Sequence, residues 1–121
     1  MRIIINNNTD PFFNLASEQY LLDSDADSAF MLWRNAPAVI IGSNQNAYAE
    51  INLDYVEKNG IKVVRRLTGG GAVFHDLGNL NYTFITPHRE NSNIDFARFC
   101  NPVIDFLKHL GCDASLSGRN D

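Results

Sequence analysis

The sequence lacks a basic excess and long apolar runs. Its 121 residues carry 10 Lys and Arg against 14 Asp and Glu, a formal net charge of −4 at pH 7. Proteins that bind nucleic acid through bulk electrostatics normally carry more positive than negative charge, so we expect no nucleic acid among the partners. No segment has the apolar length of a membrane helix, and the apolar run near the N-terminus is too short for a signal peptide. We therefore expect a cytoplasmic protein that does not engage a membrane.

Cysteine is scarce as well. The two cysteines, Cys100 and Cys112, form no CxxC pair, and no His or Cys lies at metal-ligand spacing from either. In a chain without an export signal this pattern predicts two reduced, buried thiols.

The composition that is present suits one globular domain, with 45% hydrophobic and 20% charged residues. Apolar patterning and turn residues predict the following strands: 2–6, 29–34, 38–41, 61–66 and 80–86. We expect the strands 29–34 and 38–41 to pair, and 42–52 to form a surface loop. The pattern favours an α+β domain with a mostly antiparallel sheet flanked by helices.

Capping residues predict three helices. The first has Asp10 as N-cap and runs to residue 22 or 23, the second lies between Asn52 and Gly60, and the third runs from Asn93 to Gly111. Pro102 is expected to kink or split the third helix. Its apolar residues recur at helical spacing and predict a core-facing stripe: Ile94, Phe99, Val103, Phe106, Leu107 and Leu110. The residues from 112 onward are expected to begin a strand.

The stretch "VVRRLTGGGAVFHDLGN" places two arginines before three consecutive glycines. Glycine has no Cβ, so its backbone can approach a ligand closely and aim successive N–H groups at one anion. An arginine, Arg65 or Arg66, could add a bidentate guanidinium to a phosphate or carboxylate. The alternative is structural: a wide hairpin or bulge in which glycine serves only the backbone geometry. Neither the P-loop pattern nor the dinucleotide fingerprint fits this stretch.

His75 and Asp76 follow the glycines. Adjacent residues of a strand point to opposite faces, so the two side chains need not act together. One interpretation is a hydrogen-bonded histidine near the sheet surface, and the other is direct participation in catalysis. No nucleophile for a Ser/His/Asp arrangement can be identified.

Taken together, "RRLTGGGAVFHDLGNLNYTFI" closely resembles the signature of the lipoate–protein ligase family. "FNLASEQYLL" resembles the N-terminal helix of that family, "FMLWRNAPAVIIGSNQNAYAEIN" its strand pair and amide-rich loop, and "SGRND" the segment ahead of its catalytic strand. The resemblance covers nearly the whole chain.

The resemblance implies an α+β fold shared with biotin–protein ligases and class II aminoacyl-tRNA synthetases. It also implies a reaction in which ATP and lipoate form lipoyl-adenylate with release of pyrophosphate, accompanied by Mg²⁺. The lipoyl group then passes to a lysine of a lipoyl domain of a 2-oxoacid dehydrogenase, or of the glycine-cleavage H protein.

The resemblance also implies roles for particular residues. Arg66 is expected to contact the adenylate or the lipoyl carbonyl region, and Asp121 to help hold Mg²⁺. Residues expected to line the nucleotide site through their backbone are Gly71, Ala72, Val73 and Phe74. Those expected to hydrogen-bond the adenylate are Asn79 and Asn120. Those expected to border the lipoyl chain are Trp33, Gly70 and His75.

The chain departs from the family pattern in one respect. The family's catalytic lysine lies on a strand that would follow Asp121, so we expect residues 1–121 to be the N-terminal portion of a ligase catalytic domain, with no catalytic lysine of its own. The explanations we consider are a fragment, a truncated gene product and half of a two-chain enzyme. We also expect self-association or association with a missing C-terminal half, through an exposed sheet edge and apolar face.

Two rival functions remain open. An octanoyltransferase of the same superfamily would use a cysteine and no ATP, although Gly71 stands where those enzymes typically carry an arginine. A non-catalytic lipoate-binding fragment is the other rival.

Overall fold

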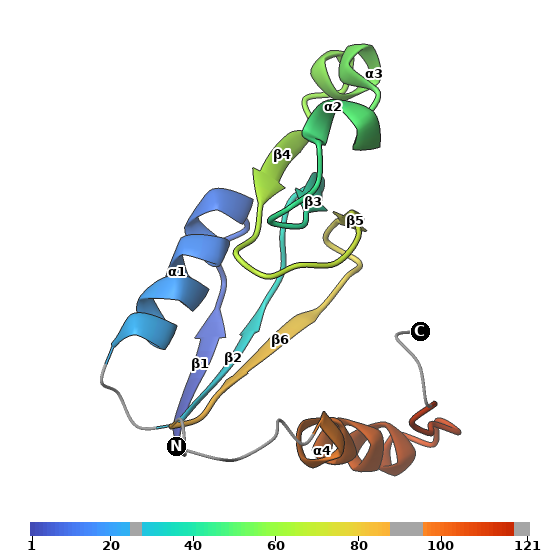
Figure 1. Cartoon of the computed structure of the whole chain (residues 1–121). Helices are drawn as coiled ribbons and strands as arrows, with labels where there is room; N and C mark the ends of the chain where they lie inside the picture. Colours follow the sequence, from blue (N-terminus) through green and yellow to red (C-terminus); the bar gives the residue numbers. More distant parts are fainter. Residues whose placement is uncertain (25–27, 88–95, 118–121) are drawn as a thin grey trace. The chain divides into compact units, whose positions relative to one another are not determined.

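The computed structural model describes residues 1–24, 28–87 and 96–117, which form six strands and four helices (Figure 1). The chain divides into two compact units, Met1–Pro87 and His88–Asp121, and each is described by itself. Among the described residues, no helix has the length and apolar character needed to cross a membrane.

The first sheet lies in the first unit and has the strand order β1-β2-β6. Its strands are β1 (Arg2–Asn6), β2 (Ala29–Trp33) and β6 (Asn81–Ile85). β1 runs parallel to β2, and β6 runs antiparallel to it. In the central strand β2, Ala29, Met31 and Trp33 are buried while the residues between them are half-buried. This alternation follows from the two-residue period of a strand, and it gives Trp33 a fixed place on the buried face.

The second sheet has the order β4-β3-β5. Its strands are β3 (Ala38–Ile41), β4 (Lys62–Arg65) and β5 (Val73–His75). The prediction that 29–34 pairs with 38–41 is wrong, because β2 and β3 belong to different sheets. The link between them makes no hairpin turn: the Ala36 N–H donates to the Thr9 carbonyl at 2.8 Å. β3 therefore continues onward from the end of β2 (Figure 1).

The α+β class is confirmed, but the expected mostly antiparallel sheet is not found. Each sheet has one parallel and one antiparallel pair of strands. The parallel partners are β1 with β2 and β3 with β4. Parallel neighbours need a long crossover, and here the crossovers are α1 (Pro11–Asp23) for the first pair and α2 (Ala47–Glu50) with α3 (Leu53–Lys58) for the second.

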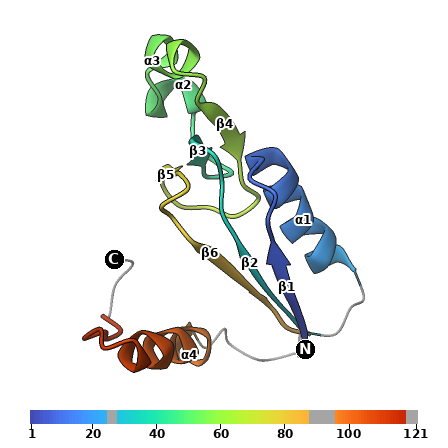
Figure 2. The same cartoon turned by 180° about the vertical axis from the view of Figure 1, so that it is seen from behind.

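Helix α1 connects the two sheets through its packing. Asp10 caps it, as predicted, by accepting from the Phe12 N–H at 3.0 Å, and Pro11 occupies the first turn. Leu15 packs against both buried clusters of the unit, one around Met31 and one around Ile40. Both views show α1 lying along the strands (Figure 1 and Figure 2). Full burial of such side chains contributes roughly 1.5–3 kcal/mol each, so α1 holds the sheets in place.

The segment between β3 and β4 differs in part from the prediction. The expected surface loop 42–52 contains the short helix α2, whose N-cap is Asn46. The second predicted helix is confirmed as α3: Asn52 caps it, and Gly60 ends it with φ of +62°.

The second unit contains α4 (Phe96–His109), which ends at Gly111 with φ of +84° as predicted. Of the two outcomes expected at Pro102, a kink or a split, the split is wrong, because the helix runs through this residue. A proline costs a helix about 3 kcal/mol, which the other turns of a long helix can sustain. The predicted cap Asn93 lies outside the described residues, as does Ile94 of the apolar stripe.

The other predictions for the second unit are also corrected. No residue of α4 is buried in the described part of the chain, so the stripe forms no core there, and Phe106 and Leu110 are exposed. Residues 112–117 form no strand, because no described strand pairs with them. Both cysteines are free as predicted, but Cys100 is half-buried and Cys112 exposed.

Candidate functional site

A groove of about 630 Å³ opens in the first unit between α1 and the two sheets. Most of its lining is apolar. The apolar residues come from α1, from strands of both sheets and from the segment that follows β4: Phe12, Leu15, Ala16, Leu22, Trp33, Ile40, Val64, Leu67, Val73, Phe84 and Ile85. The polar residues of the lining include Glu18, Arg65, Arg66, Thr68, His75 and Thr83. Such a groove suits a ligand with a long apolar part and a few polar groups.

The glycine loop, residues 69–71, is held by Arg66. The Arg66 guanidinium donates to the Gly69 carbonyl from Nε (3.2 Å) and Nη2 (2.8 Å), to the Gly71 carbonyl from Nη2 (2.8 Å), and to the Ile40 carbonyl from Nη1 (3.3 Å). Arg66 therefore shapes the loop from within. The hairpin interpretation is wrong, because β4 and β5 both pair with β3 and not with each other.

The three glycines of this loop have different requirements. Gly70 has φ of +99°, a conformation that side chains rarely adopt, and a Cβ there would lie 2.7 Å from Arg66 Nη2. A Cβ on Gly69 or Gly71 would meet nothing within 4 Å. Only Gly70 is thus fixed by the geometry of the loop itself.

Arg65 holds the neighbouring loop, residues 42–45, through its backbone carbonyls, as Arg66 holds the glycine loop. Its Nη1 lies 2.8 Å from the Gly42 carbonyl oxygen, 3.1 Å from that of Ser43 and 2.8 Å from that of Gln45. The two loops touch: a Cβ on Gly42 would lie 2.1 Å from the Gly70 carbonyl oxygen. Glycine at position 42 lets the loops come this close.

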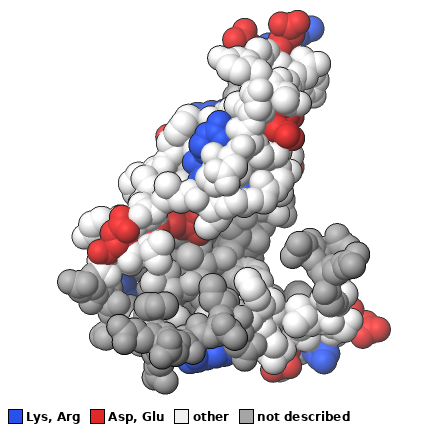
Figure 3. All heavy atoms as spheres, in the orientation of Figure 1, with Lys and Arg blue, Asp and Glu red and all other residues white. Residues whose placement is uncertain are grey.

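Neither arginine pairs with a carboxylate among the described residues. The ion pair found there joins Lys62 Nζ and Asp10 Oδ1 at 3.2 Å. Arg65 and Arg66 therefore donate hydrogen bonds to backbone carbonyls. These neutral acceptors fix a guanidinium in place but do not neutralise its charge. Basic atoms gather on the face shown in Figure 3, with acidic atoms to either side. This end of the groove suits an anionic group.

His75 lies on β5 with its ring in the groove lining. Its Nδ1 lies 3.1 Å from Asn35 Nδ2, and its ring meets Trp33 edge-on with centroids 6.0 Å apart. Burial and the nearby charge of Arg66 hold the pKa of His75 below its usual range. Asp76 turns elsewhere and accepts from the Gly78 N–H at 2.8 Å. His75 is thus hydrogen-bonded, and the side chains of His75 and Asp76 make separate contacts.

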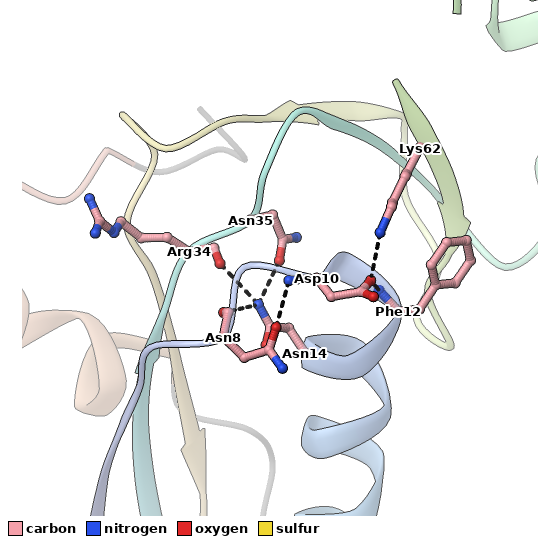
Figure 4. Close-up of polar contacts among 7 residues, drawn as sticks. All are labelled: Asn8, Asp10, Phe12, Asn14, Arg34, Asn35 and Lys62. Carbon is pink, nitrogen blue, oxygen red and sulfur yellow. Dashed lines mark hydrogen bonds and ion pairs between the residues drawn. The ribbon is translucent and has the colours of Figure 1, made fainter. Parts of the chain in front are cut away.

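Behind His75 stand two fully buried amides, Asn14 and Asn35, both 0% exposed. Asn14 Nδ2 lies 2.9 Å from the Asn8 carbonyl, 2.9 Å from the Arg34 carbonyl and 2.8 Å from Asn35 Oδ1. Figure 4 shows these three contacts converging on one nitrogen at the start of α1. Asn14 therefore joins α1, the segment before it and the β2–β3 link.

Glu18 lines the groove from α1. Its carboxylate accepts from the Thr83 hydroxyl, which in turn accepts from Trp33 Nε1 at 3.0 Å. Burial raises the pKa of Glu18, and the Thr83 hydrogen bond opposes that rise in part. This chain of contacts fixes the indole of Trp33 at the side of the groove.

The structure brings together only some of the predicted site residues. Arg66, Val73, His75 and Trp33 line the groove. Gly70 lies against Arg66, and Gly71 accepts a hydrogen bond from it. The remaining described residues lie on or near β5 but do not line the groove: Ala72, Phe74 and Asn79. Asn120 and Asp121 lie outside the described residues.

Sequence reasoning missed four residues of the site: Asn14, Asn35, Glu18 and Thr83. A signal existed for Asn14, a short polar residue in the apolar segment that opens α1, because an amide placed there must find partners once buried. Glu18 and Thr83 carry no comparable local signal, since their contact joins segments far apart in the sequence.

Comparison with protein families gives one match that covers most of the chain. The family model described as the lipoyl protein ligase A/B catalytic domain matches residues 10–121. The chain is 53% identical over 124 aligned residues to lipoate-protein ligase LplJ of Bacillus subtilis and 48% identical to lipoate–protein ligase 1 of Staphylococcus aureus. All of this chain is covered in both cases, but it spans only 38% of the length of either relative.

Solved structures agree with this match. A lipoate-protein ligase A bound with ATP is 33% identical with a TM-score of 0.85, covering 99% of this chain and 51% of that one. P. falciparum LipL1 in complex with lipoate is 35% identical with a TM-score of 0.84, covering 99% and 39%. A bipartite lipoate protein ligase of Thermoplasma acidophilum, described with its E2 lipoyl domain, is 33% identical with a TM-score of 0.85, covering 99% and 49%.

Proposed function

The chain belongs to the lipoyl protein ligase A/B catalytic-domain family, and from this premise we propose that the whole protein joins lipoate to a carrier protein at the expense of ATP. In the first step a lipoate carboxylate oxygen attacks the α-phosphorus of ATP, which gives lipoyl-adenylate and pyrophosphate. In the second step the amine of a carrier lysine attacks the acyl carbon, and AMP leaves as the amide forms.

The observation that carries the proposal is a groove with apolar walls and a positive charge at one end. Its walls are apolar, including Trp33 and Ile40, and its Arg66 end holds a guanidinium whose charge no described carboxylate neutralises. Lipoate has the matching form, an aliphatic chain ending in a carboxylate. The volume of about 630 Å³ lies in the range of about 300–1,000 Å³ typical of small-molecule sites.

Arg66 and the glycine loop have the chemistry for the charged parts of the reaction. The carboxylate and the α-phosphate are both anions, and a preorganised cation stabilises the charge that gathers as they react. We propose that Arg66 contacts the adenylate or lipoyl carbonyl region and that Trp33, Gly70 and His75 border the lipoyl chain. The proposed nucleotide contacts are the backbone of Gly71, Ala72, Val73 and Phe74, with the side chains of Asn79 and Asn120.

The described residues do not provide a metal site. No group of three or more His, Cys, Asp and Glu side chains lies close enough to hold an ion in the described part of the chain. Asp121, suggested for Mg²⁺, lies outside that part. We therefore assign no step to a metal and keep Asp121 as a proposal only.

The proposed acceptors are lipoyl domains of 2-oxoacid dehydrogenases or the glycine-cleavage H protein. The bipartite ligase that this chain resembles is described with an E2 lipoyl domain, which supports the first class. Association with a second copy or with a separate C-terminal portion also remains a proposal. Ile3 and Ile5 of the edge strand β1 are 70% exposed and provide an apolar surface for it.

The test is lipoyl transfer to an added lipoyl domain by the whole protein, with and without ATP. We expect transfer to require ATP and to release pyrophosphate. Transfer from an octanoyl thioester without ATP would instead assign an octanoyltransferase. For residues 1–121 alone we expect lipoate binding with little adenylation, and robust single-turnover formation of lipoyl-adenylate by that chain would contradict this.

A further inference from the structure

The two buried amides behind His75 belong to one connected chain of hydrogen bonds, which begins at the half-buried Asn6 and which we call the amide chain: Asn6, Asn14, Asn35 and His75. Asn6 Nδ2 donates to Asn14 Oδ1 at 2.9 Å, Asn14 Nδ2 donates to Asn35 Oδ1 at 2.8 Å, and Asn35 Nδ2 meets His75 Nδ1 at 3.1 Å. The chain runs from β1 through α1 and the β2–β3 link to β5. It ends on a ring that lines the groove.

The direction of every bond in the amide chain is fixed by two backbone carbonyls. The oxygens of Asn8 and Arg34 can only accept, and both lie 2.9 Å from the same atom of Asn14, which must therefore be its NH₂ group. An NH₂ group of Asn35 in this place would set donor against donor at 2.8 Å, so the Asn35 atom is Oδ1, and it shares the two protons of Asn14 with the two carbonyls. The NH₂ group of Asn35 is then the group that faces His75.

Because the Asn35 NH₂ group can only donate, His75 Nδ1 must accept. A neutral imidazole that accepts at Nδ1 carries its proton on Nε2. We propose that the amide chain locks His75 in the neutral Nε2–H form, and that Nε2–H donates to an oxygen of the acyl or phosphoryl group bound in the groove. This step rests on the proposed function, because it takes its ligand from there. Asn14 and Asn35 are then positioning residues for His75.

Three further observations agree with this assignment. Protonation of Nδ1 would place two donors face to face at 3.1 Å. Arg66, which lines the same groove, opposes a second positive charge on the ring and, with burial, keeps the pKa of His75 low. Nε2 has no partner among the described residues, so its N–H is available to a ligand.

The assignment also limits what His75 can do. Nε2 already carries the proton and Nδ1 is occupied by Asn35, so neither nitrogen can accept a proton from a substrate. A neutral imidazole N–H is also far too weak an acid to release its proton near pH 7. His75 is therefore a fixed hydrogen-bond donor that orients the ligand beside Arg66, and it is not a general base or general acid.

The test is ¹⁵N NMR of the histidine ring nitrogens in residues 1–121 at pH 7.5, first without ligand. The chain has three histidines, and His75→Gln identifies the signals of His75 by their loss. We expect a protonated Nε2 and an unprotonated Nδ1. An Nδ1–H tautomer or an imidazolium at this pH would overturn the proposal without the need for any other variant.

Asn35→Asp sharpens the test, because it changes one NH₂ group into an oxygen of the same size. The new carboxylate can accept from Nδ1–H, so we expect His75 to gain a proton at Nδ1 and its pKa to rise. Unchanged ring signals in a folded Asn35→Asp variant would show that Asn35 does not set the tautomer. Asn59→Asp, at the exposed amide that caps the C-terminus of α3, is the matched control and should leave the His75 signals as they are.

Lipoate is the probe for the ligand half of the proposal, and the chain's single tryptophan, Trp33, reports its binding by fluorescence. We expect lipoate to shift the Nε2–H signal of His75, and His75→Ala, which removes the donor, to weaken lipoate binding about tenfold, the size of one lost hydrogen bond. If fluorescence shows binding while the Nε2 signal stays fixed, the donor role is wrong. If no lipoate binds, the proposed function and the donor role fail together, while the free-state spectrum still decides the tautomer.

Discussion

The amide chain and the two arginine loops both fix residues around the groove, but the first uses neutral amides and the second uses charged guanidinium groups. The amide chain is neutral, and its central members Asn14 and Asn35 are fully buried. The arginine loops, residues 42–45 and 69–71, are exposed or half-buried apart from the buried Gly42, and they surround two guanidinium groups that no described carboxylate neutralises. Both regions join segments that are distant in sequence through hydrogen bonds to backbone carbonyls.

The difference has a physical basis. A buried amide has lost its water, so each donor and acceptor must find a protein partner, and removing one side chain leaves several groups unpaired. An exposed guanidinium can still be solvated, so its loss costs less stability. Its charge also remains available to an anion. We therefore expect changes in the amide chain to act mainly on stability, and changes in the arginine loops to act mainly on the proposed binding of an anion.

The largest expected effect is on the amide chain. Asn14→Leu keeps a side chain of similar size but leaves four groups without their donor or acceptor: Asn6 Nδ2, Asn35 Oδ1 and the carbonyls of Asn8 and Arg34. We expect a loss of about 3–5 kcal/mol in the free energy of unfolding, since each unpaired buried group costs about 1–3 kcal/mol. Urea unfolding followed by Trp33 fluorescence measures it.

A milder change checks the same point if the Leu variant fails to fold. Asn6→Ala removes the outermost bond of the amide chain together with the exposed bond from the Asn8 N–H, and should cost about 1 kcal/mol. If Asn14→Leu lowers the free energy of unfolding no more than Asn6→Ala does, the buried amides do not provide the extra stability that sets the amide chain apart from the arginine loops.

The next effect concerns the contact of the two arginine loops. Gly42→Ala places a Cβ 2.1 Å from the Gly70 carbonyl oxygen, so the loops must move apart. We expect a loss of about 1–3 kcal/mol, the usual cost of overpacking. Gly69→Ala is the control, because its Cβ would meet nothing within 4 Å. Equal stability of the two variants would show that the close approach of the loops is not needed.

A smaller effect is expected from Arg66→Lys, and it should appear in binding more than in stability. Lysine keeps the charge but cannot donate to the carbonyls of Gly69, Gly71 and Ile40 at once. We expect lipoate to bind about tenfold more weakly, or about 1.4 kcal/mol. Arg34→Lys is the control, because the Arg34 side chain donates to the Leu77 carbonyl and Arg34 does not line the groove. Should both variants bind lipoate alike, the anion site lies elsewhere.

The smallest effect is on pH dependence. Burial raises the pKa of Glu18, so the folded chain binds this proton more tightly than the unfolded chain does. The contribution of Glu18 to the free energy of unfolding is therefore greatest below the pKa of Glu18 in the unfolded chain, near 4.5. It falls as the pH rises through the higher pKa of Glu18 in the folded chain. Glu18→Gln keeps a neutral acceptor for Thr83 and should be at least as stable as the wild type at pH 7. Unfolding at pH 4 and pH 7 checks this, and a variant that is less stable only at pH 7 would contradict it.

The sequence predicts local structure better than it predicts the connections between elements. The start of α1 at Asp10 and Pro11, and the cap of α3 at Asn52, follow from residues close in sequence. The pairing of β2 with β3 was predicted wrongly, because the link between them is bound by Thr9 and Asn14, which lie far back in the chain. Local secondary-structure propensity does not include contacts with residues so distant in the sequence.

The same holds for the candidate site. The residue pattern alone singles out His75 and one of Arg65 and Arg66, and the resemblance to the ligase signature adds Trp33 and the choice of Arg66. Asn14 and Asn35 were missed, because an asparagine normally indicates a surface or capping position, and its burial becomes visible only when all its partners are placed. The glycine run itself was informative, but the structure requires glycine there only at Gly70, and equally at Gly42, which the pattern did not single out.

The most direct test of the account is a lipoate titration of residues 1–121 followed by Trp33 fluorescence, with Arg66→Lys and Arg34→Lys measured in parallel. The account predicts a saturable change for the wild type, the same affinity for Arg34→Lys and about tenfold weaker binding for Arg66→Lys. The absence of any saturable change in the folded wild-type chain would contradict the claim that this groove and its arginine form a lipoate site.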